Sequence, residues 1–296
     1  MILGGTIILS KHIIKVVYQV KTFRTRIYPL DAALPEGFPV GSTVAIGGSP
    51  GTGKTVLVTQ IAWEILKQGG GVIYVNLDDS PHAVMELFSN FGWDLTPYIN
   101  EGRFGIVDCF SFRLGKMKKS LKGVVREVSL ENLEAILHDI SEALAQLKGD
   151  PKVLIIDSIN ELMFRYDIPQ VLEFVKTVRA VISKGEGVTV ILTLHISTDA
   201  LQELLAHLEY LVDGIILTEI EPNLMEIGIP LKQLMVKKMR GLPTNSYWIP
   251  YAIASDGIHG VDPKKLALLV KEKMRRYQEL RAVIEGAKSA GEDQSS

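Results

Sequence analysis

Apolar runs and helical patterns alternate along most of this chain of 296 residues. An apolar run at residues 42–46 precedes residues 56–67, where apolar side chains recur at helical spacing. The run at residues 72–77 barely alternates, which is typical of a strand buried on both faces. Further strands are predicted at 104–109, 153–157 and 188–194, and further helices at 83–91, 129–147, 169–183 and 199–209. This alternation predicts an α/β fold in which helices cover both faces of a mostly parallel sheet.

The last strand patterns follow one another without a helical pattern between them, at residues 214–218, 233–238 and 246–253. We expect them to extend the sheet as antiparallel edge strands. Residues 262–284 then form a helical pattern with apolar positions near one stripe: Leu266, Leu269, Val270, Met274, Tyr277, Leu280 and Ile284. The stripe needs a cover, either the body of this chain or an unknown protein partner.

Composition limits the architecture and the surroundings. With 47% hydrophobic and 22% charged residues, the chain can bury the core of one α/β domain of about 240 residues with additions at each end. A net charge of −2 gives no global attraction to nucleic acid or to a membrane. The single cysteine, Cys109, excludes an intrachain disulfide framework and is most simply a small core residue.

No apolar stretch approaches the roughly 20 residues that a membrane-spanning helix needs. The apolar residues 1–9 are too few, and charged residues follow them, whereas a signal peptide places its charges first. We therefore expect a cytoplasmic protein without a membrane partner.

One motif lies between the first predicted strand of the sheet and its helix. It matches G-x-x-x-x-G-K-[ST], the Walker A phosphate-binding loop, with the residues Gly48, Ser49, Pro50, Gly51, Thr52, Gly53, Lys54 and Thr55. The glycines allow backbone N–H groups to point inward around phosphates, and the following helix adds its positive end. Lys54 can reach the β and γ phosphates, and the Thr55 hydroxyl can hold Mg²⁺. A plain glycine-rich turn is improbable in this context, so we expect a bound nucleoside triphosphate.

Asp157 ends the buried apolar strand 153–157 and is the candidate Walker B acid. At the carboxyl end of a strand in an open α/β sheet it would lie beside the phosphate-binding loop and bind Mg²⁺ directly or through water. The alternative is an ordinary aspartate that caps the next turn.

Asp78 and Asp79 end the strand that follows the phosphate-loop helix, so they face the same crevice. Adjacent side chains on a strand point to opposite faces, so at most one carboxylate can accept a proton from the attacking water. The sequence does not show which one it is. In the alternative interpretation, Asp79, Ser80 and Pro81 only cap the following helix.

Several motifs together resemble the KaiC branch of the RecA/RadA superfamily over roughly residues 23–260. They are Phe38-Pro39-Val40-Gly41-Ser42, Asn76-Leu77-Asp78-Asp79-Ser80-Pro81, Phe91-Gly92-Trp93-Asp94-Leu95, Ile155-Ile156-Asp157-Ser158 and Lys237-Lys238-Met239-Arg240-Gly241. The resemblance implies a RecA-like P-loop NTPase fold, ATP with Mg²⁺, and a ring, commonly a hexamer, with nucleotide at subunit interfaces. It divides the chain into an N-terminal extension (1–22), the ATPase domain (23–260), an amphipathic helix (261–285) and a disordered tail (286–296).

The resemblance also gives roles to residues outside the phosphate-binding loop. Lys238 and Arg240 share one face of a strand, and in the KaiC branch the matching cations reach the γ-phosphate held by the neighbouring subunit. The alternative is a solvated cation pair on an edge strand. His195 ends the strand 188–194, where RecA-like proteins place a γ-phosphate sensor, although histidines at strand ends often only satisfy a loop. The other histidines lack the spacing of zinc ligands.

Two departures from the family pattern matter. KaiC-type proteins usually carry paired glutamates where this chain has Asp78 and Asp79, which are one methylene shorter. Because a misplacement of about 1 Å can cost on the order of a hundredfold in rate, we expect slow turnover. Glu209 and Tyr210 stand where the circadian protein has phosphorylated hydroxyl residues, so a clock kinase is not expected.

The N-terminal extension and a basic segment leave alternatives open. Residues 13–20 can add a strand, or an upstream-extended start codon accounts for the extension. Six basic residues crowd the segment between Cys109 and Ser129: Arg113, Lys116, Lys118, Lys119, Lys122 and Arg126. Such a segment can contact nucleic acid, but a solvated insertion is favoured because the overall charge is near neutral.

Three functions therefore fit the sequence. The first is a KaiC-like ATPase that couples hydrolysis to a conformational change of the ring in signalling or regulation. The second is a RadA-like accessory ATPase of DNA repair or recombination, and the third is a scaffold that ATP assembles without hydrolysis. No motif distinguishes adenine from guanine.

Overall fold

The computed structural model describes residues 5–10, 13–18, 20–113 and 121–292. Its strands are β1 (Gly5–Ser10), β2 (Ile13–Tyr18), β3 (Thr22–Phe23), β4 (Phe38–Pro39), β5 (Thr43–Gly48), β6 (Gly71–Asn76), β7 (Phe104–Asp108), β8 (Val124–Glu127), β9 (Lys152–Asp157), β10 (Thr189–His195), β11 (Gly214–Ile220), β12 (Lys232–Met239), β13 (Ile249–Ala254) and β14 (Gly257–Gly260). Its helices are α1 (Tyr28–Ala33), α2 (Lys54–Lys67), α3 (Pro81–Asn90), α4 (Thr96–Asn100), α5 (Leu133–Gln146), the 3₁₀ helix η2 (Ile159–Phe164), α6 (Ile168–Val178), the π-helix η3 (Arg179–Gly185), α7 (Asp199–Leu211), α8 (Pro222–Glu226) and α9 (Pro263–Glu292).

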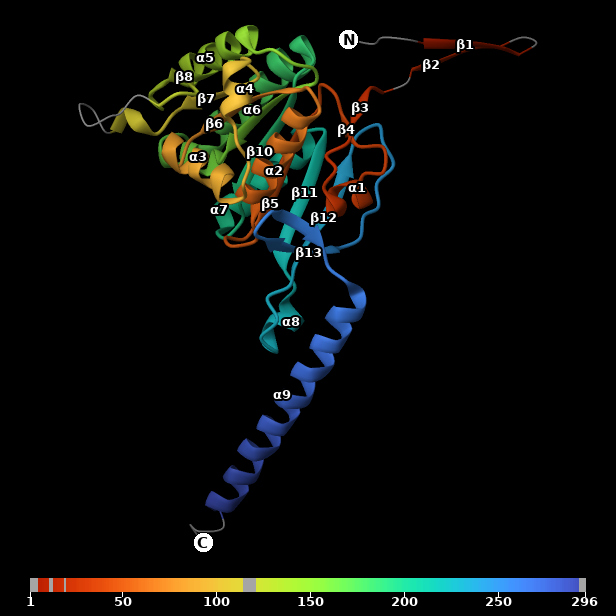
Figure 1. Cartoon of the computed structure of the whole chain (residues 1–296), viewed down its shortest axis with the longest axis vertical. Coiled ribbons are helices and arrows are strands. Elements are labelled where there is room, and N and C mark those ends of the chain that lie inside the picture. Colours follow the sequence, from red (N-terminus) through yellow and green to blue (C-terminus); the bar gives the residue numbers. More distant parts are fainter. Residues whose placement is uncertain (1–4, 11–12, 19, 114–120, 293–296) are drawn as a thin grey trace.

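A twisted sheet of ten strands forms the centre of the domain, in the order β14-β13-β12-β11-β5-β10-β9-β6-β7-β8 (Figure 1). The seven strands from β11 to β8 are mutually parallel, and β12, β13 and β14 are antiparallel to their neighbours. The predicted α/β fold with a mostly parallel sheet is confirmed.

The expectation that residues 214–218 form an antiparallel edge strand is wrong. β11 pairs in parallel with β5 in the middle of the sheet, and only its other neighbour, β12, runs antiparallel to it. The physical reason is the helix α7, which carries the chain back across one face after β10, so that β11 enters in the same direction as β10.

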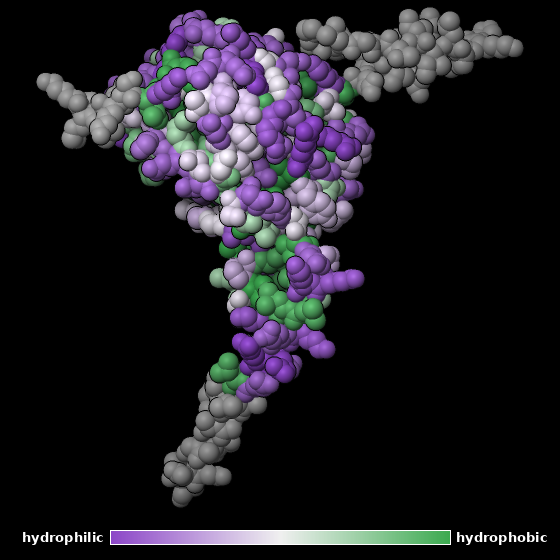
Figure 2. Space-filling view, viewed as in Figure 1, coloured by the Kyte–Doolittle hydropathy of each residue, from purple (hydrophilic) through white to green (hydrophobic). Residues whose placement is uncertain are grey.

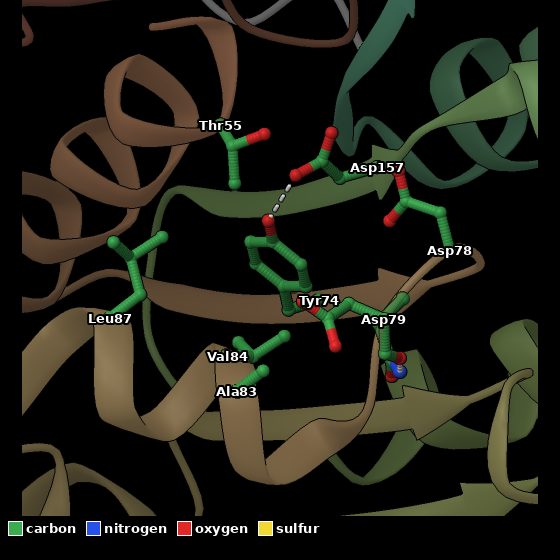
Figure 3. Close-up of a pocket in the computed structure, with 9 residues that line it drawn as sticks. Thr55, Tyr74, Asp78, Asp79, Ala83, Val84, Leu87 and Asp157 are labelled. Carbon is green, nitrogen blue, oxygen red and sulfur yellow. Dashed lines mark hydrogen bonds between the residues drawn. The ribbon is translucent and has the colours of Figure 1, made fainter.

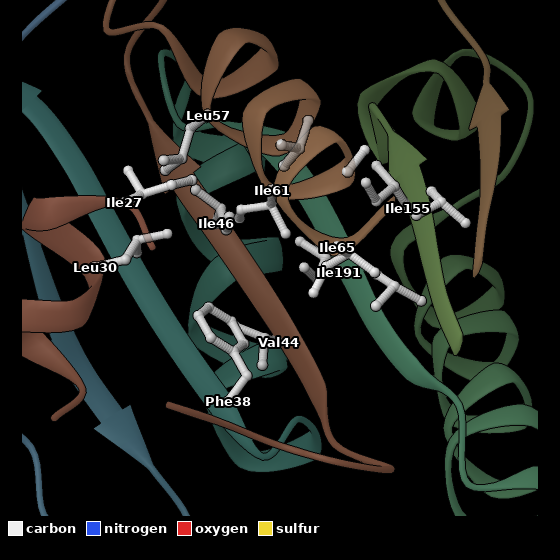
Figure 4. Close-up of a cluster of buried hydrophobic side chains, with 14 of the residues drawn as sticks. Ile27, Leu30, Phe38, Val44, Ile46, Leu57, Ile61, Ile65, Ile155 and Ile191 are labelled. Carbon is white, nitrogen blue, oxygen red and sulfur yellow. The ribbon is translucent and has the colours of Figure 1, made fainter. Parts of the chain in front are cut away.

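Two hydrophobic cores lie on opposite faces of the sheet. On one face α2 packs its apolar stripe against β5 and its neighbours, where Ile61 lies between Ile46 and Ile155 (Figure 4). On the other face α5, α6 and α7 cover a second core. Side chains of β5, β6 and β9 are buried throughout or nearly so, which explains why their sequences scarcely alternate.

Several local elements differ from the expectation. The basic segment contains a short strand, β8, because residues 124–127 add to the sheet edge next to β7. The predicted helix 169–183 changes to a π-helix at Arg179. Residues 286–292 of the tail expected to be disordered continue α9, which ends at Glu292.

α9 extends away from the domain, and β1 and β2 form an antiparallel hairpin near the other terminus (Figure 1). Apolar residues gather where α9 leaves the body beside α8 (Figure 2), and side chains such as Leu268, Leu280 and Met225 are exposed there and further along α9. The partner predicted for this stripe stays a prediction. Within the residues that the structure describes, no helix has the length and apolar character that crossing a bilayer requires.

Candidate nucleotide-binding site

The phosphate-binding loop connects the end of β5 to the start of α2. Gly51 (φ 79°) and Gly53 (φ 92°) adopt left-handed backbone conformations that other residues rarely take. Gly53 is the N-cap of α2 and supplies no side-chain cap, and the first turn carries no acidic residue. The N–H groups at this helix end are therefore available to an anion, which the positive end of the helix also favours.

Two strands brace the loop from the side. The Thr52 hydroxyl lies 2.8 Å from the Thr218 hydroxyl on β11, and the Tyr251 hydroxyl on β13 donates to the Thr52 carbonyl oxygen at 2.6 Å. A Cβ at Gly48 would lie 2.1 Å from the Thr218 hydroxyl oxygen, so only glycine fits there. Sequence reasoning missed Thr218 and Tyr251, because nothing in their local patterns indicates contact with the loop.

Lys54 is buried beneath the loop, with 4% of its surface exposed. Its ammonium group donates to the carbonyl oxygens of Gly48 (2.8 Å) and Ser49 (3.0 Å) and lies 3.0 Å from His195 Nδ1. Burial lowers the pKa of Lys54 to about 8, and the charge of Asp157 partly opposes this shift. Lys54 is thus held against the phosphate-binding loop, where the motif places it.

His195 ends β10 directly opposite Gly48 in the register with β5. Burial, and after it the charge of Lys54, lowers the pKa of His195, so the neutral ring can accept a hydrogen bond from Lys54 at Nδ1. The backbone N–H of His195 donates to Asn160 Oδ1 at 2.7 Å. His195 therefore lies at the phosphate-binding loop, while its role as a γ-phosphate sensor stays a prediction.

Asp157 lies at the carboxyl end of β9, which is separated from β5 by β10. Its side chain is 4% exposed and accepts hydrogen bonds from the Tyr74 hydroxyl (2.6 Å) and from the Thr193 hydroxyl. Burial and the Asp157 charge raise the pKa of Tyr74 well above its usual range, so Tyr74 remains a donor. These two hydroxyls fix the carboxylate, and sequence reasoning had identified neither of them.

A pocket of about 200 Å³ joins the predicted acids to the start of α2 (Figure 3). It is lined by Thr55, Tyr74, Asn76, Asp78, Asp79, Ala83, Val84, Leu87 and Asp157. Three elements far apart in the sequence therefore bring a hydroxyl and three carboxylates to one place. Hydroxyl and carboxylate oxygens are the ligands that Mg²⁺ prefers, so Thr55 and Asp157 fit the predicted metal role by their chemistry.

The two adjacent aspartates have different environments. Asp78 lines the pocket and keeps access to solvent. Its pKa is nevertheless raised to about 6, first by the partial burial of the carboxyl group and then by the negative charges of Asp157 and Glu161. Asp79 instead accepts a hydrogen bond from the Ser80 backbone N–H at 2.6 Å, while Ser80 caps α3. The geometry thus separates a carboxylate near Asp157 from one engaged at the helix start.

Lys238 and Arg240 lie near the end of the strands that is opposite the phosphate-binding loop. Lys238 pairs with Ile215 near the start of β11, whereas Thr218, later in β11, pairs with Gly48. Both cations reach the last turn of α7, where Lys238 donates to the Glu209 carbonyl oxygen and Arg240 to that of Tyr210 at 3.0 Å. The two side chains project to the same helix end although only Lys238 lies in β12 and Arg240 directly follows it. At this end of the strands they cannot reach phosphates bound to their own chain.

The arginines of the basic segment have partners in the protein. The guanidinium of Arg113 lies over the Phe112 ring (4.7 Å) and 3.5 Å from Glu161, and Arg126 approaches Asp139 (3.7 Å) and Glu142 (3.8 Å). Lys116, Lys118 and Lys119 lie outside the described residues. A nucleic-acid partner for this segment remains a prediction.

Comparisons with known proteins show which family and which fold this chain is similar to. A family model described as "ATPase: KaiC" matches residues 23–265. A UPF0273 protein of Pyrococcus horikoshii is 31% identical over 236 residues, covering 79% of this chain and 92% of that protein. A UPF0273 protein of Thermotoga maritima is also 31% identical, over 240 residues that cover 81% of this chain and 95% of the relative.

A solved structure supports the fold. The crystal structure of a KaiC-like protein from Pyrococcus horikoshii matches with a TM-score of 0.66 and 24% sequence identity, covering 82% of this chain and 100% of that one. At this identity the likeness concerns the fold alone, and the predicted RecA-like arrangement is confirmed.

Proposed function

This chain belongs to the KaiC ATPase family, and from that premise we propose that it binds ATP with Mg²⁺ and hydrolyses it slowly at sites completed by a neighbouring subunit. The observation that carries the proposal is the pocket in which Thr55, Asp78 and Asp157 meet at the start of α2. Family membership alone gives the ATPase class, and the residues supply the mechanism.

The phosphate-binding loop provides the binding step. Backbone N–H groups at the start of α2 hold the phosphates, and Lys54 exchanges its bonds to the Gly48 and Ser49 carbonyl oxygens for bonds to phosphate oxygens. Thr55 and Asp157 would hold Mg²⁺, which when bound neutralises charge on the phosphates. Tyr74 and Thr193 keep the Asp157 carboxylate oriented by donating to its two oxygens.

Asp78 is the proposed general base. Its raised pKa matches the requirement for a group that accepts a proton near neutral pH, and its position beside Asp157 brings it to the reaction centre. Asp79 serves chiefly at the start of α3. Because Asp78 is shorter than glutamate, we expect the base to be imperfectly placed and the turnover to be slow.

The charge that builds on the γ-phosphate calls for cations beyond Lys54 and Mg²⁺, and Lys238 and Arg240 of the same chain cannot reach it. Lys238 and Arg240 lie at the end of the strands opposite the phosphate-binding loop. A ring of identical subunits, expected to be a hexamer in this family, would bring them to the nucleotide of the next subunit. Such a head-to-tail interface makes hydrolysis depend on assembly. We propose that the resulting change of ring conformation serves signalling or regulation.

Phosphate release from size-fractionated protein tests this function. Asp78→Asn is expected to abolish release while ATP binding measured by calorimetry persists, and Asp79→Asn is the matched control that retains most activity. Unchanged release from Asp78→Asn would refute the base assignment. A steep, salt-dependent stimulation by DNA would instead favour the repair function, and an intact ring with bound ATP but without phosphate release would favour the scaffold.

A further inference from the structure

The buried carboxylate of Asp213 lies apart from the nucleotide pocket, next to Arg240 at the opposite end of the strands. Asp213 directly precedes β11, and its side chain is 7% exposed. It accepts a hydrogen bond from the Thr43 backbone N–H (3.0 Å) and from the Arg179 guanidinium (2.9 Å), and it pairs with Lys184 at 2.8 Å. A buried charge is stable only with such partners.

The π-helix η3 explains how two cations reach the same carboxylate. Arg179 and Lys184 are the first and sixth residues of this segment. Because a π-turn bonds residue i to residue i+5, residues five apart lie near the same side of the helix, whereas an α-helix would separate them. The irregular helix therefore directs both side chains at Asp213.

Arg240 is attached to the same residue twice. Its backbone N–H donates to the Asp213 carbonyl oxygen at 2.8 Å, and its guanidinium Nη1 lies 3.8 Å from Asp213 Oδ1. The other end of the guanidinium donates to the Tyr210 carbonyl oxygen. The Arg240 side chain is half exposed, so its guanidinium group is accessible from solvent while Asp213 holds the residue in place.

The cluster carries more positive than negative charge. Arg179, Lys184 and Arg240 pair with the carboxylate of Asp213, and the other nearby carboxylate, Glu209, is paired with Lys237. Lys238 adds a further cation, whose pKa is lowered by burial and then by the charge of Arg240. Although burial by itself would raise it, hydrogen bonds from Arg179 and Lys184 hold the pKa of Asp213 below its usual value. Asp213 therefore remains ionised at neutral pH, and the excess positive charge favours an anion from outside the chain.

We infer that Asp213 is a positioning residue that holds Arg240 in place for the γ-phosphate of the neighbouring subunit. The inference rests on the proposed function, in which Arg240 acts across the interface. Asp213 does not touch the nucleotide. It supplies the fixed negative charge and the carbonyl oxygen against which Arg240 is oriented.

Asp213 also contacts the start of the strand that ends in the phosphate-binding loop. Its backbone N–H donates to the Thr43 carbonyl oxygen at 2.8 Å, and its carboxylate accepts from the Thr43 N–H. A change at Asp213 can thus act on its own site through β5 or on the neighbour's site through Arg240. The test must separate these two effects.

Asp213→Asn removes the charge and keeps the shape of the side chain. We expect kcat to fall about ten- to a hundredfold, because Arg240 is displaced, with little change in KM for ATP. Asp139→Asn is the matched control and should keep wild-type kinetics, since Asp139 lies on α5 and pairs with Arg126 of β8, the edge strand farthest from β12 on that side of the sheet. If Asp213→Asn does not fold, Asp213→Glu keeps the charge but displaces it by one methylene, and the same loss in kcat is expected.

Mixed rings distinguish the neighbour's site from the chain's own site. The variants Asp213→Asn and Lys54→Ala are mixed in equal amounts, and co-assembly is verified by capture of a tag on one of them. In a mixed ring, a subunit with Asp213→Asn keeps its phosphate-binding loop, and a neighbouring subunit with Lys54→Ala can supply a correctly held Arg240. If the defect lies in Arg240, the mixture should recover up to about a quarter of the wild-type rate, because half of the subunits have a working loop and half of these have a suitable neighbour. No recovery in co-assembled rings, or an unchanged kcat in Asp213→Asn, would overturn the inference. Inactive wild-type protein, or full activity in Arg240→Ala, would instead refute the proposed function itself.

Discussion

The pH dependence of kcat/KM follows from two groups of the pocket with opposite pKa shifts. The pKa of Asp78 is raised to about 6 by burial and by Asp157, and the pKa of Lys54 is lowered to about 8 by burial. Asp78 must be ionised to accept a proton, so kcat/KM should fall as the pH drops through about 6. Lys54 must be charged to hold phosphate, so kcat/KM should fall as the pH rises through about 8.

The size of the effect follows from the two values. One pH unit beyond either pKa leaves about a tenth of the enzyme in the required state, so kcat/KM near pH 5 and near pH 9 should be about a tenth of its maximum near pH 7. The assay is phosphate release at low ATP, constant ionic strength and excess Mg²⁺. Since kcat/KM reports the free enzyme, its profile refers to the state described by the structure.

A charge-neutral variant tests the cause of the acid limb. Glu161 is the next charge after Asp157 that raises the pKa of Asp78, so Glu161→Gln should move the acid limb to lower pH. Glu86→Gln, an exposed glutamate on α3, is the matched control and should leave the limb in place. Protonation of ATP itself affects kcat/KM equally in both variants, so it cannot produce a difference between them. An acid limb that is absent, or that does not move in Glu161→Gln, would show that Asp78 does not control the acid side of the profile.

Three further predictions concern the loop and the core. Gly48→Ala should abolish ATP binding in calorimetry, because its Cβ would lie 2.1 Å from the Thr218 hydroxyl oxygen. In the control Gly51→Ala, the Cβ meets no atom within 4 Å, so the change should cost only about 1–2 kcal/mol of backbone strain. Equal binding by the two variants would contradict this. Tyr251→Phe removes the hydrogen bond to the Thr52 carbonyl oxygen, and a loss of about 1 kcal/mol should weaken ATP binding roughly fivefold in the same assay. Ile61→Ala, at a fully buried position between α2 and the sheet, should lower the free energy of unfolding in urea by about 2–5 kcal/mol, and a loss below 1 kcal/mol would show that this core is not closely packed.

Local sequence patterns were sufficient for the parts of the fold that depend on periodicity and on a fixed motif. The buried run of β6 and the stripe of α2 are readable because their burial leaves a regular apolar pattern. The phosphate-binding loop is readable because its glycines and Lys54 have fixed spacing. Asp157 and Asp78 were placed at the same pocket because the carboxyl ends of parallel strands share one edge.

Contacts between distant segments could not be predicted in this way. The direction of β11 depends on where α7 returns the chain, and a strand pattern alone is the same in both directions. Tyr74 contacts Asp157 of another strand and Tyr251 contacts Thr52 of the phosphate-binding loop, and both contacts join segments that are distant in sequence. Neither tyrosine differs locally from a core residue. Likewise, the choice between Asp78 and Asp79 depends on their surroundings in three dimensions.

If hydrolysis requires cations from a neighbouring subunit, phosphate release must depend on assembly, and dilution of the protein measures this dependence. Phosphate release per protomer should be measured with saturating ATP and Mg²⁺ while the protein is diluted through its assembly transition, which light scattering follows in the same samples. We expect release per protomer to fall together with assembly, and Arg240→Ala to be inactive even when assembled. Constant release per protomer from rings to monomers would contradict this expectation.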